Sequence, residues 1–393
     1  MKDTPDSVIA ALDAMDIDTF RAEVDALDGE MDRYTHLNRP LVAWVGRKGF
    51  AEGVRFLVEK GAKPSSKALQ EAIFLADGLG DDMSAVAALV EGGAPIEEEV
   101  DGLNALGWAA SINYGGRRAG DIVKLLLEHG ADPNVGGNTP PVHVAIQRPA
   151  MNALAALLEG GADPNVVYDG CTPIVGLLLE MRSAFRRDEE RDDGSADVAR
   201  EFVPPTLGIL LKHGADARIP NRHGKSPLLL ATLTDSCPDS VIIQLCEAGA
   251  VTTDTIQVNE KDDMDLLAYS LLKKRSPDVL RALIDAGLPL NADYALFGGG
   301  TFLEVMLTHE LDLCEHLWDS SETFRNALVQ FKSHQDANAL ALCAMAGNEK
   351  MVRALHAAGV SANETMEGGI TTLALVENRA PKLLPLIQEL ASS

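Results

Sequence analysis

Apolar residues recur at helical spacing in the segment IVKLLLEHG at residues 122–130. The pattern predicts an amphipathic helix with one buried face. Gly130 closes the segment and can take the left-handed backbone conformation that ends a helix. The ending LLLEHGADPN at 125–134 returns as LLEGGADPN at 157–165, so the marker glycine recurs after 31 residues. A near-copy at this distance predicts a structural repeat rather than a site.

The same ending can be followed through most of the chain. Successive copies end at Gly29, Gly61, Gly93, Gly130, Gly161, Gly214, Gly249, Gly287, Ser321 and Gly359, where Ser321 stands in place of the glycine. The spacing gives a period of about 33 residues with some insertions. The segment 371–390 is predicted to be a further, terminal unit without the Gly-Ala ending.

A second pattern precedes many of these endings by about twenty residues. It is seen as TPPVHVAI at 139–146, CTPIVGLLL at 171–179 and KSPLLLATL at 225–233. Thr or Ser before proline at a helix start can accept hydrogen bonds from free backbone N–H groups, while proline needs no donor there. We therefore predict that Thr139 and Ser226 cap the first helix of their units.

Together the two patterns resemble the ankyrin repeat, a β-turn followed by two antiparallel helices that carries a Thr-Pro-Leu-His motif. The resemblance covers nearly the whole chain. It implies an all-α fold, a solenoid of about ten to eleven helix-turn-helix units with short β-turn connections, in a single domain over residues 1–393. One unit cannot bury its own apolar face, so neighbouring units are expected to stack.

The longest interval between markers runs from Gly161 to Gly214. Removing one period leaves about twenty extra residues, most simply the segment RSAFRRDEERDDGSADVARE at 182–201. It contains five Arg and seven acidic residues. Two interpretations remain open: a solvated helical extension or disordered loop, and an arm that contacts a partner.

The chain is strongly acidic, with 34 Lys and Arg against 59 Asp and Glu and a net charge of −25. This charge repels nucleic acid and anionic membranes. It serves solubility, or it attracts a basic protein partner. Five cysteines without a CxxC pair, no signal peptide and no long apolar run favour a cytoplasmic protein with no metal site.

Candidate partner-binding residues lie where the repeat is irregular or projects. The resemblance places Trp44 and Trp108 on the concave side of the first helix, although such rings also pack against neighbouring units. The remaining candidates are Tyr114, Arg117 and Arg118 in one loop, and Glu97, Glu98, Glu99, Asp101, Tyr168, Arg222, His223, Asp262 and Asp263 in turns. The acidic ones would speed association with a basic protein, or serve solubility alone.

The chain carries no recognised catalytic motif, and the family resemblance implies protein binding without a cofactor. We predict a module that binds another protein through its concave face and turns, with a monomer favoured. Its acidity suggests a neutraliser of a basic effector or enzyme, such as an immunity or inhibitor protein. The alternatives are an adaptor with two partners and an enzyme with a diverged catalytic segment at 252–345.

Overall fold

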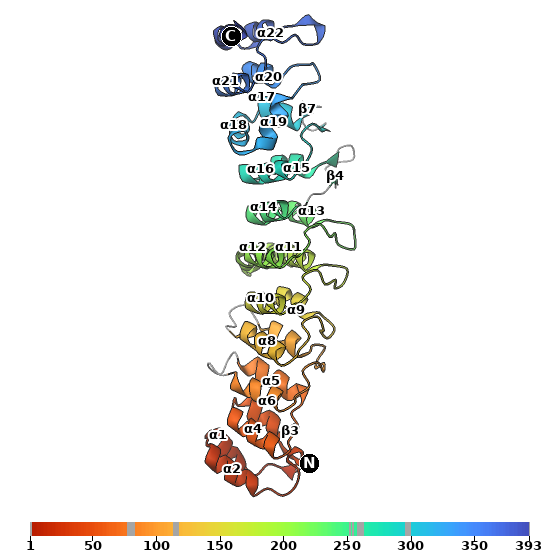
Figure 1. Ribbon diagram of the computed structural model, residues 1–393, viewed down its shortest axis with the longest axis vertical. Helices are drawn as coiled ribbons and strands as arrows, with labels where there is room; N and C mark the ends of the chain where they lie inside the picture. Colours follow the sequence, from red (N-terminus) through yellow and green to blue (C-terminus); the bar gives the residue numbers. More distant parts are fainter. Residues whose placement is uncertain are drawn as a thin grey trace. The chain divides into compact units, whose positions relative to one another are not determined.

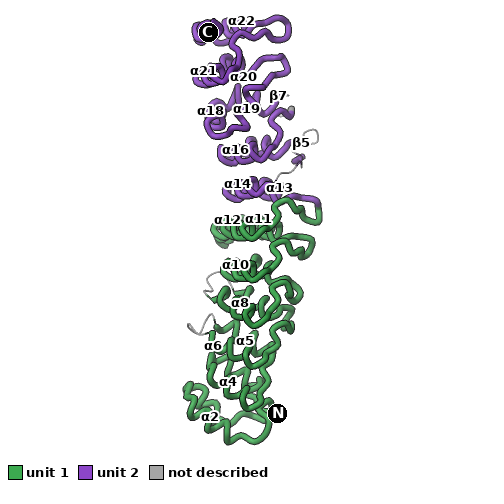
Figure 2. The backbone as a smooth tube through the Cα atoms, viewed as in Figure 1, with its two compact units in different colours: residues 1–223 green, residues 224–393 purple. Residues whose placement is uncertain are grey.

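The computed structural model describes residues 2–76, 83–112, 118–250, 253, 255–257, 263–294 and 300–392. They divide into two compact units, unit 1 at residues 1–223 and unit 2 at residues 224–393 (Figure 2). Both consist mainly of short helices, which confirms the prediction of a mostly helical fold. No helix in these described ranges is both long and apolar enough to cross a bilayer.

In unit 1 the helices follow one another in antiparallel pairs (Figure 1). The pairs are α1 (Asp6–Asp13) and α2 (Ile17–Asp25), α3 (Leu41–Arg47) and α4 (Ala51–Glu59), α5 (Ser66–Ala76) and α6 (Ser84–Glu91), α7 (Ala105–Ala110) and α8 (Ala119–Glu128), α9 (Pro141–Gln147) and α10 (Met151–Glu159), and α11 (Pro173–Arg191) and α12 (Ser195–Lys212). Near the N-terminus, β2 (Tyr34–His36) follows η1 (Met31–Arg33) and pairs with β1 (Lys2–Asp3) in parallel and with β3 (Arg39–Pro40) in antiparallel orientation.

The helix pairs of unit 1 stack in two rows. The inner helices α3, α5, α7, α9 and α11 contact one another in succession, and so do the outer helices α2, α4, α6, α8, α10 and α12. Leu57, Leu89, Leu126 and Leu157, one from each of α4, α6, α8 and α10, are fully buried. Burying such a side chain stabilises the fold by about 1.5–3 kcal/mol, so the apolar stripe of each outer helix drives the stacking.

The repeated Asp-Pro-Asn turn joins neighbouring pairs through side-chain hydrogen bonds. Asn134 Oδ1 accepts a hydrogen bond from the Asp163 N–H (2.7 Å), and Asn134 Nδ2 donates to the Gly161 carbonyl (3.2 Å). Asn165 repeats the arrangement one pair later and accepts from the Asp216 N–H (2.7 Å). The near-copy in the sequence is therefore explained by architecture, because each turn binds the next.

The marker glycines end the outer helices as the sequence predicts. Gly130 has a φ of 89° and Gly161 a φ of 92°, in the left-handed region that favours glycine. Ser321 differs, because its φ is −122° and it begins a further helix instead of a left-handed turn. Its hydroxyl accepts a hydrogen bond from the Phe324 N–H (3.1 Å).

Of the two predicted helix caps, one is confirmed. Ser226 Oγ accepts a hydrogen bond from the Leu229 N–H (3.2 Å) at the start of its helix. Thr139 does not cap α9, and that prediction was wrong. The second proline of TPPVHVAI makes Pro140 the residue before the helix, so Thr139 lies one residue too early and its hydroxyl donates to Tyr168 Oη (3.1 Å).

The segment 182–201 is helical apart from a short turn. It extends α11 to 19 residues and starts α12, which has 18. The two helices contact each other along their length and are joined by a turn in which Asp192 (φ 50°) and Gly194 (φ 72°) are left-handed. The segment is thus helical rather than a disordered loop, and its contact with a partner stays a prediction.

Unit 2 is also built of helix pairs. Its helices are α13 (Pro227–Thr232), α14 (Asp239–Glu247), α15 (Leu266–Leu272), α16 (Pro277–Asp285), α17 (Phe302–Thr308), α18 (Leu311–Ser320), α19 (Glu322–Val329), α20 (Ala339–Met345), α21 (Glu349–Ala357), α22 (Thr372–Arg379) and α23 (Leu384–Ser392), with η3 (Glu367–Gly369) and η4 (Pro381–Leu383). Two antiparallel hairpins project from it, β4 (Ile256–Gln257) with β5 (Asp263–Met264) and β6 (Asp293–Tyr294) with β7 (Gly300–Thr301). The added helix α19 packs against α16 and α18, and this is where the sequence repeat is least regular.

Candidate functional site

Trp44, on α3, is half-buried and surrounded by cationic side chains. The His36 ring packs edge-on against the indole, with centroids 4.9 Å apart. Arg47 Cζ lies 6.0 Å and Lys48 Nζ 5.9 Å from the indole centroid, within range of a cation–π interaction. The indole Nε1 is buried and has no hydrogen-bond partner in the structure. The ring is therefore held in place by His36, Arg47 and Lys48, and contact with a partner stays a prediction.

Glu71, on α5, links this tryptophan to a neighbouring helix pair. Its Oε1 lies 3.0 Å from Arg39 Nε, and its Oε2 lies 3.8 Å from Arg47 Nη1. The Glu71 side chain is only 12% exposed, whereas Arg39 and Arg47 are 39% and 41% exposed, so the carboxylate is buried beneath cations that still contact water. Sequence reasoning missed Arg39, Arg47 and Glu71, because the pattern within one helix does not show which side chains of the next pair it meets.

The Trp108 side chain, on α7, contacts the turn that precedes its own helix. The indole Nε1 donates a hydrogen bond to the Val100 carbonyl (3.0 Å) in the turn that precedes α7. We call such a turn, which projects before an inner helix, a finger. Buried Asn104 stabilises the same finger, since its Oδ1 caps Gly107 N–H (2.9 Å) and its Nδ2 donates to the Val135 carbonyl (2.7 Å). Trp108 thus holds the finger in position, and its predicted place on the concave side stays a prediction.

The acidic finger at 97–101 bonds to the fingers and helices beside it. Glu97 accepts hydrogen bonds from Asn104 Nδ2 (2.9 Å) and from the Asp132 N–H (2.8 Å). Glu98 accepts one from Ser66 Oγ (3.0 Å). These carboxylates therefore join neighbouring helix pairs.

Asp101 ends the same finger and also contacts a neighbouring helix. Its Oδ2 lies 3.1 Å from Lys67 Nζ and 3.3 Å from Gln70 Nε2, both on α5. The hydrogen bond from Lys67, followed by that from Gln70, lowers the pKa of the Asp101 carboxyl below its usual value. Asp101 stays ionised at neutral pH and remains exposed.

Tyr168 lies in the finger before α11 and is half-buried. Its hydroxyl accepts a hydrogen bond from Thr139, and its ring lies 5.4 Å from that of His143. His143 Nε2 donates to the Val166 carbonyl (2.9 Å). Burial lowers the pKa of His143, partly offset by this hydrogen bond, so the ring is neutral near pH 7.

Arg222 and His223 are exposed at the tip of the next finger. Arg222 Nη1 lies 2.7 Å from Asp169 Oδ1, and the Arg222 N–H donates to the Gly170 carbonyl (3.0 Å). Arg222 Nε lies 3.3 Å from His223 Nε2. Arg222 therefore contacts the finger that carries Tyr168, through Asp169 and Gly170.

The other predicted residues are more scattered. Glu99 and Asp263 are exposed, the latter in the β4–β5 hairpin, while Arg118 is half-buried just before α8. Three predicted residues, Tyr114, Arg117 and Asp262, lie outside the described residues. The structure therefore gathers most of the unit 1 candidates on successive fingers, whereas Asp263 belongs to unit 2.

A groove in unit 2 was missed by the sequence analysis. It is a hollow of about 620 Å³ between the inner helices α17, α20 and α22 and the fingers that precede α20 and α22. Ile370 is 48% exposed at its edge, and Met345 and Leu375 line it from the helices. Apolar side chains that remain open to water in a concave surface are typical of binding sites.

Charged groups complete this groove. His334 Nδ1 lies 3.7 Å from Glu304 Oε1, and Glu367 and Arg379 also line the hollow. The two fingers are joined by the Glu367 N–H, which donates to the Gln335 carbonyl (3.3 Å). The alternating apolar and charged lining suits a protein surface better than a small uncharged ligand.

Metal ligands and thiols were the remaining chemical groups to place. The described residues contain no group of three or more His, Cys, Asp or Glu side chains arranged as metal ligands. All five cysteines are free, and burial raises the pKa of Cys237, Cys246 and Cys314 to about 12. These thiols stay protonated and behave as small core side chains.

Comparison with known proteins identifies part of the array. Residues 72–168 match the family model of ankyrin repeats (3 copies). No curated protein matches the chain. The ankyrin repeat domain of Bcl-3, described as a unique member of the IkappaB protein family, aligns with 22% identity and a TM-score of 0.46 over 62% of this chain and 99% of its own. The human ASB11 ankyrin repeat domain aligns with 17% identity and a TM-score of 0.43 over 60% of this chain and 96% of its own. The chain therefore contains ankyrin repeats, in residues 72–168.

Proposed function

We propose that this chain binds another protein through its inner helices and fingers. Ankyrin repeats generally mediate protein–protein interaction, and their fold is typically a non-catalytic binding module. The observation that carries the proposal is the unit 2 groove, in which exposed Ile370 and half-buried Met345 lie beside Glu367 and Arg379. Such a mixture of open apolar and charged side chains is what a partner surface requires.

The charge distribution supports a basic partner. Unit 1 has 22 Lys and Arg against 36 Asp and Glu, and unit 2 has 12 against 23. Because both units are acidic, the field would attract a cationic protein over the whole array and speed its association. A neutraliser that covers the cationic cleft of a basic effector or enzyme, as an immunity or inhibitor protein does, fits this field. The cations around Trp44 are a local exception to it.

We also propose that the repeat array comprises ten to eleven units. The helices of the described residues can be grouped as pairs from α1–α2 to α22–α23, with α19 added between two of them. This grouping extends the family match beyond residues 72–168 in both directions. It supports the predicted unit ends, with the exception of the changed conformation at Ser321.

The groove can be tested with Ile370→Asp in the full chain. The charge placed in an apolar contact should weaken capture of the natural partner by about tenfold or more. Val329→Asp on α19 is the matched control, since Val329 is 36% exposed and lies outside both the groove and the inner helices. Partner identity and affinity would be measured by native mass spectrometry and calorimetry. Equal affinity for both variants would remove the groove from the proposal, and an acidic captured partner would remove the neutraliser.

A two-partner adaptor is the second candidate, favoured by the separate surfaces of the two units. Trp44 and the finger at 97–101 lie in unit 1, and the groove lies in unit 2. For an adaptor, Trp44→Ala and Ile370→Asp should each lose a different protein from the captured set. Loss of the same protein from both variants would support one partner spanning the array and contradict the adaptor.

A further inference from the structure

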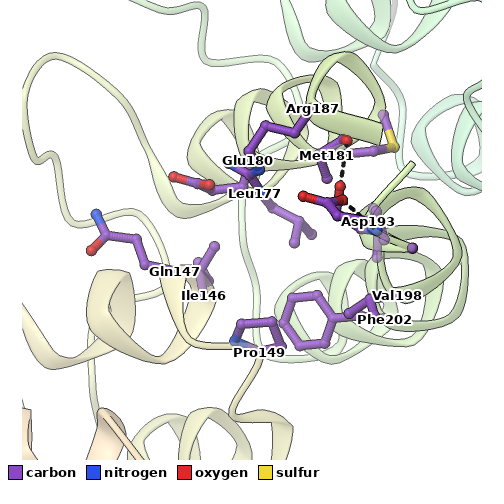
Figure 3. Close-up of a pocket in the computed structure, with 15 residues that line it drawn as sticks. Ile146, Gln147, Pro149, Leu177, Glu180, Met181, Arg187, Asp193, Val198 and Phe202 are labelled. Atoms are coloured by element: carbon purple, nitrogen blue, oxygen red, sulfur yellow. Dashed lines mark hydrogen bonds between the residues drawn. The ribbon is translucent and has the colours of Figure 1, made fainter. Parts of the chain in front are cut away.

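The extension of α11 and α12 forms a pocket that the stacking of the repeat does not require. The pocket has a volume of about 330 Å³ and lies between these helices and the C-terminal end of α9 (Figure 3). Leu177 and Met181 from α11, Phe202 from α12 and Ile146 from α9 form its apolar lining. The pocket therefore lies at the opposite end of α9 from the finger that precedes this helix.

The inserted residues hold one wall of this pocket in place. Ser195 Oγ donates a hydrogen bond to the Ala184 carbonyl (2.8 Å), which ties the start of α12 to α11. Asp193 Oδ1 accepts the Ser195 N–H (3.0 Å). Val198, one turn further along α12, lines the pocket and is 43% exposed. The wall is thus ordered by its own hydrogen bonds, yet it leaves an apolar side chain in water.

Carboxylates outnumber cations around the apolar lining. Glu180 and Asp193 contribute two negative charges and Arg187 one positive charge, while Gln147 is polar and neutral. The hydrogen bonds from Ser195 lower the pKa of Asp193, with smaller contributions from nearby Arg187 and Arg191, so its carboxylate stays ionised at neutral pH. Figure 3 shows Glu180 and Asp193 on either side of Leu177.

We propose that this pocket takes a large apolar side chain, such as Leu, Met or Phe, from a partner protein segment that carries basic residues beside it. The apolar side chain covers Leu177, Met181 and Val198, and the flanking cations pair with Glu180 and Asp193. The proposal rests on the proposed protein-binding function and adds a docking site outside the inner helices and fingers.

Size and charge select this occupant. A pocket of about 330 Å³ is at the small end of ligand pockets, and it suits one anchoring side chain rather than a long peptide. Neighbouring α9 and α10 have 7 and 9 residues and stack without any extension, so stacking alone does not explain helices of 19 and 18 residues. The excess of carboxylates favours a basic rather than an acidic segment.

The probe is the blocked peptide GSKLKSG, added to the full chain labelled with ¹³C at its methionine methyl groups. Met181 lines the pocket, and its signal is assigned by its loss in Met181→Leu. We expect the Met181 signal to shift on titration. A peptide with Ala in place of Leu should bind about tenfold or more weakly because the buried apolar contact is lost. A peptide with Glu in place of both Lys should bind about three- to fivefold or more weakly.

Two variants test the location of the effect. Val198→Trp should block the opening and abolish the Met181 shift, whereas Val329→Trp, at an exposed valine of α19 outside the pocket, should preserve it. Glu180→Gln should weaken binding of GSKLKSG but not of its Glu-containing form, with exposed Glu189→Gln as its control. If Val198→Trp changes the circular dichroism spectrum, the Glu180 pair still decides the outcome. A Met181 signal that stays unchanged at millimolar GSKLKSG, or that shifts equally with the Ala peptide, would overturn the proposal.

The natural partner separates this proposal from the one on which it rests. If the chain binds no protein, neither the wild type nor any variant captures a specific partner. If protein binding is right and the pocket wrong, wild type and Val198→Trp capture the same partner with equal affinity. If both are right, Val198→Trp weakens capture about tenfold or more while Val329→Trp does not.

Discussion

The fingers of unit 1 and the groove of unit 2 differ in which side chains they leave open to water. In unit 1 the conspicuous polar side chains bond to one another: Glu97 to Asn104, Asp101 to Lys67, and Arg222 to Asp169. In unit 2 apolar side chains such as Ile370 and Met345 line an open hollow. The comparison teaches that a run of charges in a repeat protein can connect neighbouring helix pairs, whereas a hollow with open apolar side chains remains where packing between helix pairs is incomplete.

The largest effect on stability is expected when the hydrogen-bond network of unit 1 is broken at Asn104, which is completely buried. Asn104→Ala removes the cap of α7 and deprives the Val135 carbonyl and Glu97 Oε2 of the donor that the amide supplies. The free energy of unfolding should fall by about 2–4 kcal/mol, measured by urea denaturation. Asn152→Ala, at an exposed position of α10, should change it by less than about 0.5 kcal/mol. Similar losses in the two variants would contradict the structural role of the network.

A smaller effect is expected at Trp108. Trp108→Phe keeps an aromatic ring but removes the hydrogen bond to the Val100 carbonyl. Stability should fall by about 0.5–1.5 kcal/mol, and amide exchange in the finger at 97–101 should become faster. Trp44→Phe should change stability less, because its Nε1 has no partner in the structure to lose. The reverse order of the two effects would show that Trp108 does not hold the finger.

The smallest effect concerns His143 and depends on pH. Its pKa in the folded state lies below the ordinary value of 6.5, so the unfolded chain takes up the proton first as pH falls. The contribution of the neutral ring is therefore present above about pH 6.5 and is lost as pH falls through the lower folded pKa. Between pH 7 and pH 5, the His143→Asn variant should lose less stability than the wild type. Thermal melting at each pH measures this loss.

A control for the pH experiment comes from the repeat itself. Asn104 and Asn338 each donate a hydrogen bond to the carbonyl of a following turn, Val135 and Ser361, as His143 does to Val166. Asn at position 143 can therefore preserve the contact without titrating. Identical pH profiles for wild type and variant would show that burial does not hold His143 neutral.

Sequence periodicity was sufficient for the repeat but not for all of its local details. The left-handed glycines and the cap at Ser226 follow from one residue and its neighbours, so they could be predicted. Thr139 was assigned wrongly because a second proline moved the helix start by one residue. Ser321 matched the spacing, yet the structure uses it to begin α19.

The candidate sites were harder to predict because they depend on contacts between helix pairs that are far apart in the sequence. The acidic residues were conspicuous in the sequence, but only the neighbouring chain segments show that Glu97 bonds to Asp132 and Asp101 to Lys67. The unit 2 groove is made by residues from three inner helices and two fingers, and no local pattern marks them as a group.

The sequence by itself determined the helix period, the turns between helices and the presence of ankyrin repeats, because these depend on interactions over a few residues. Only the tertiary structure decided which side chains join neighbouring helix pairs and which remain open to water. The insertion shows the difference most clearly: its helical continuation was one of two interpretations of the sequence, whereas the apolar pocket at α11 and α12 exists because Ile146, Met181 and Val198 come from three different helices.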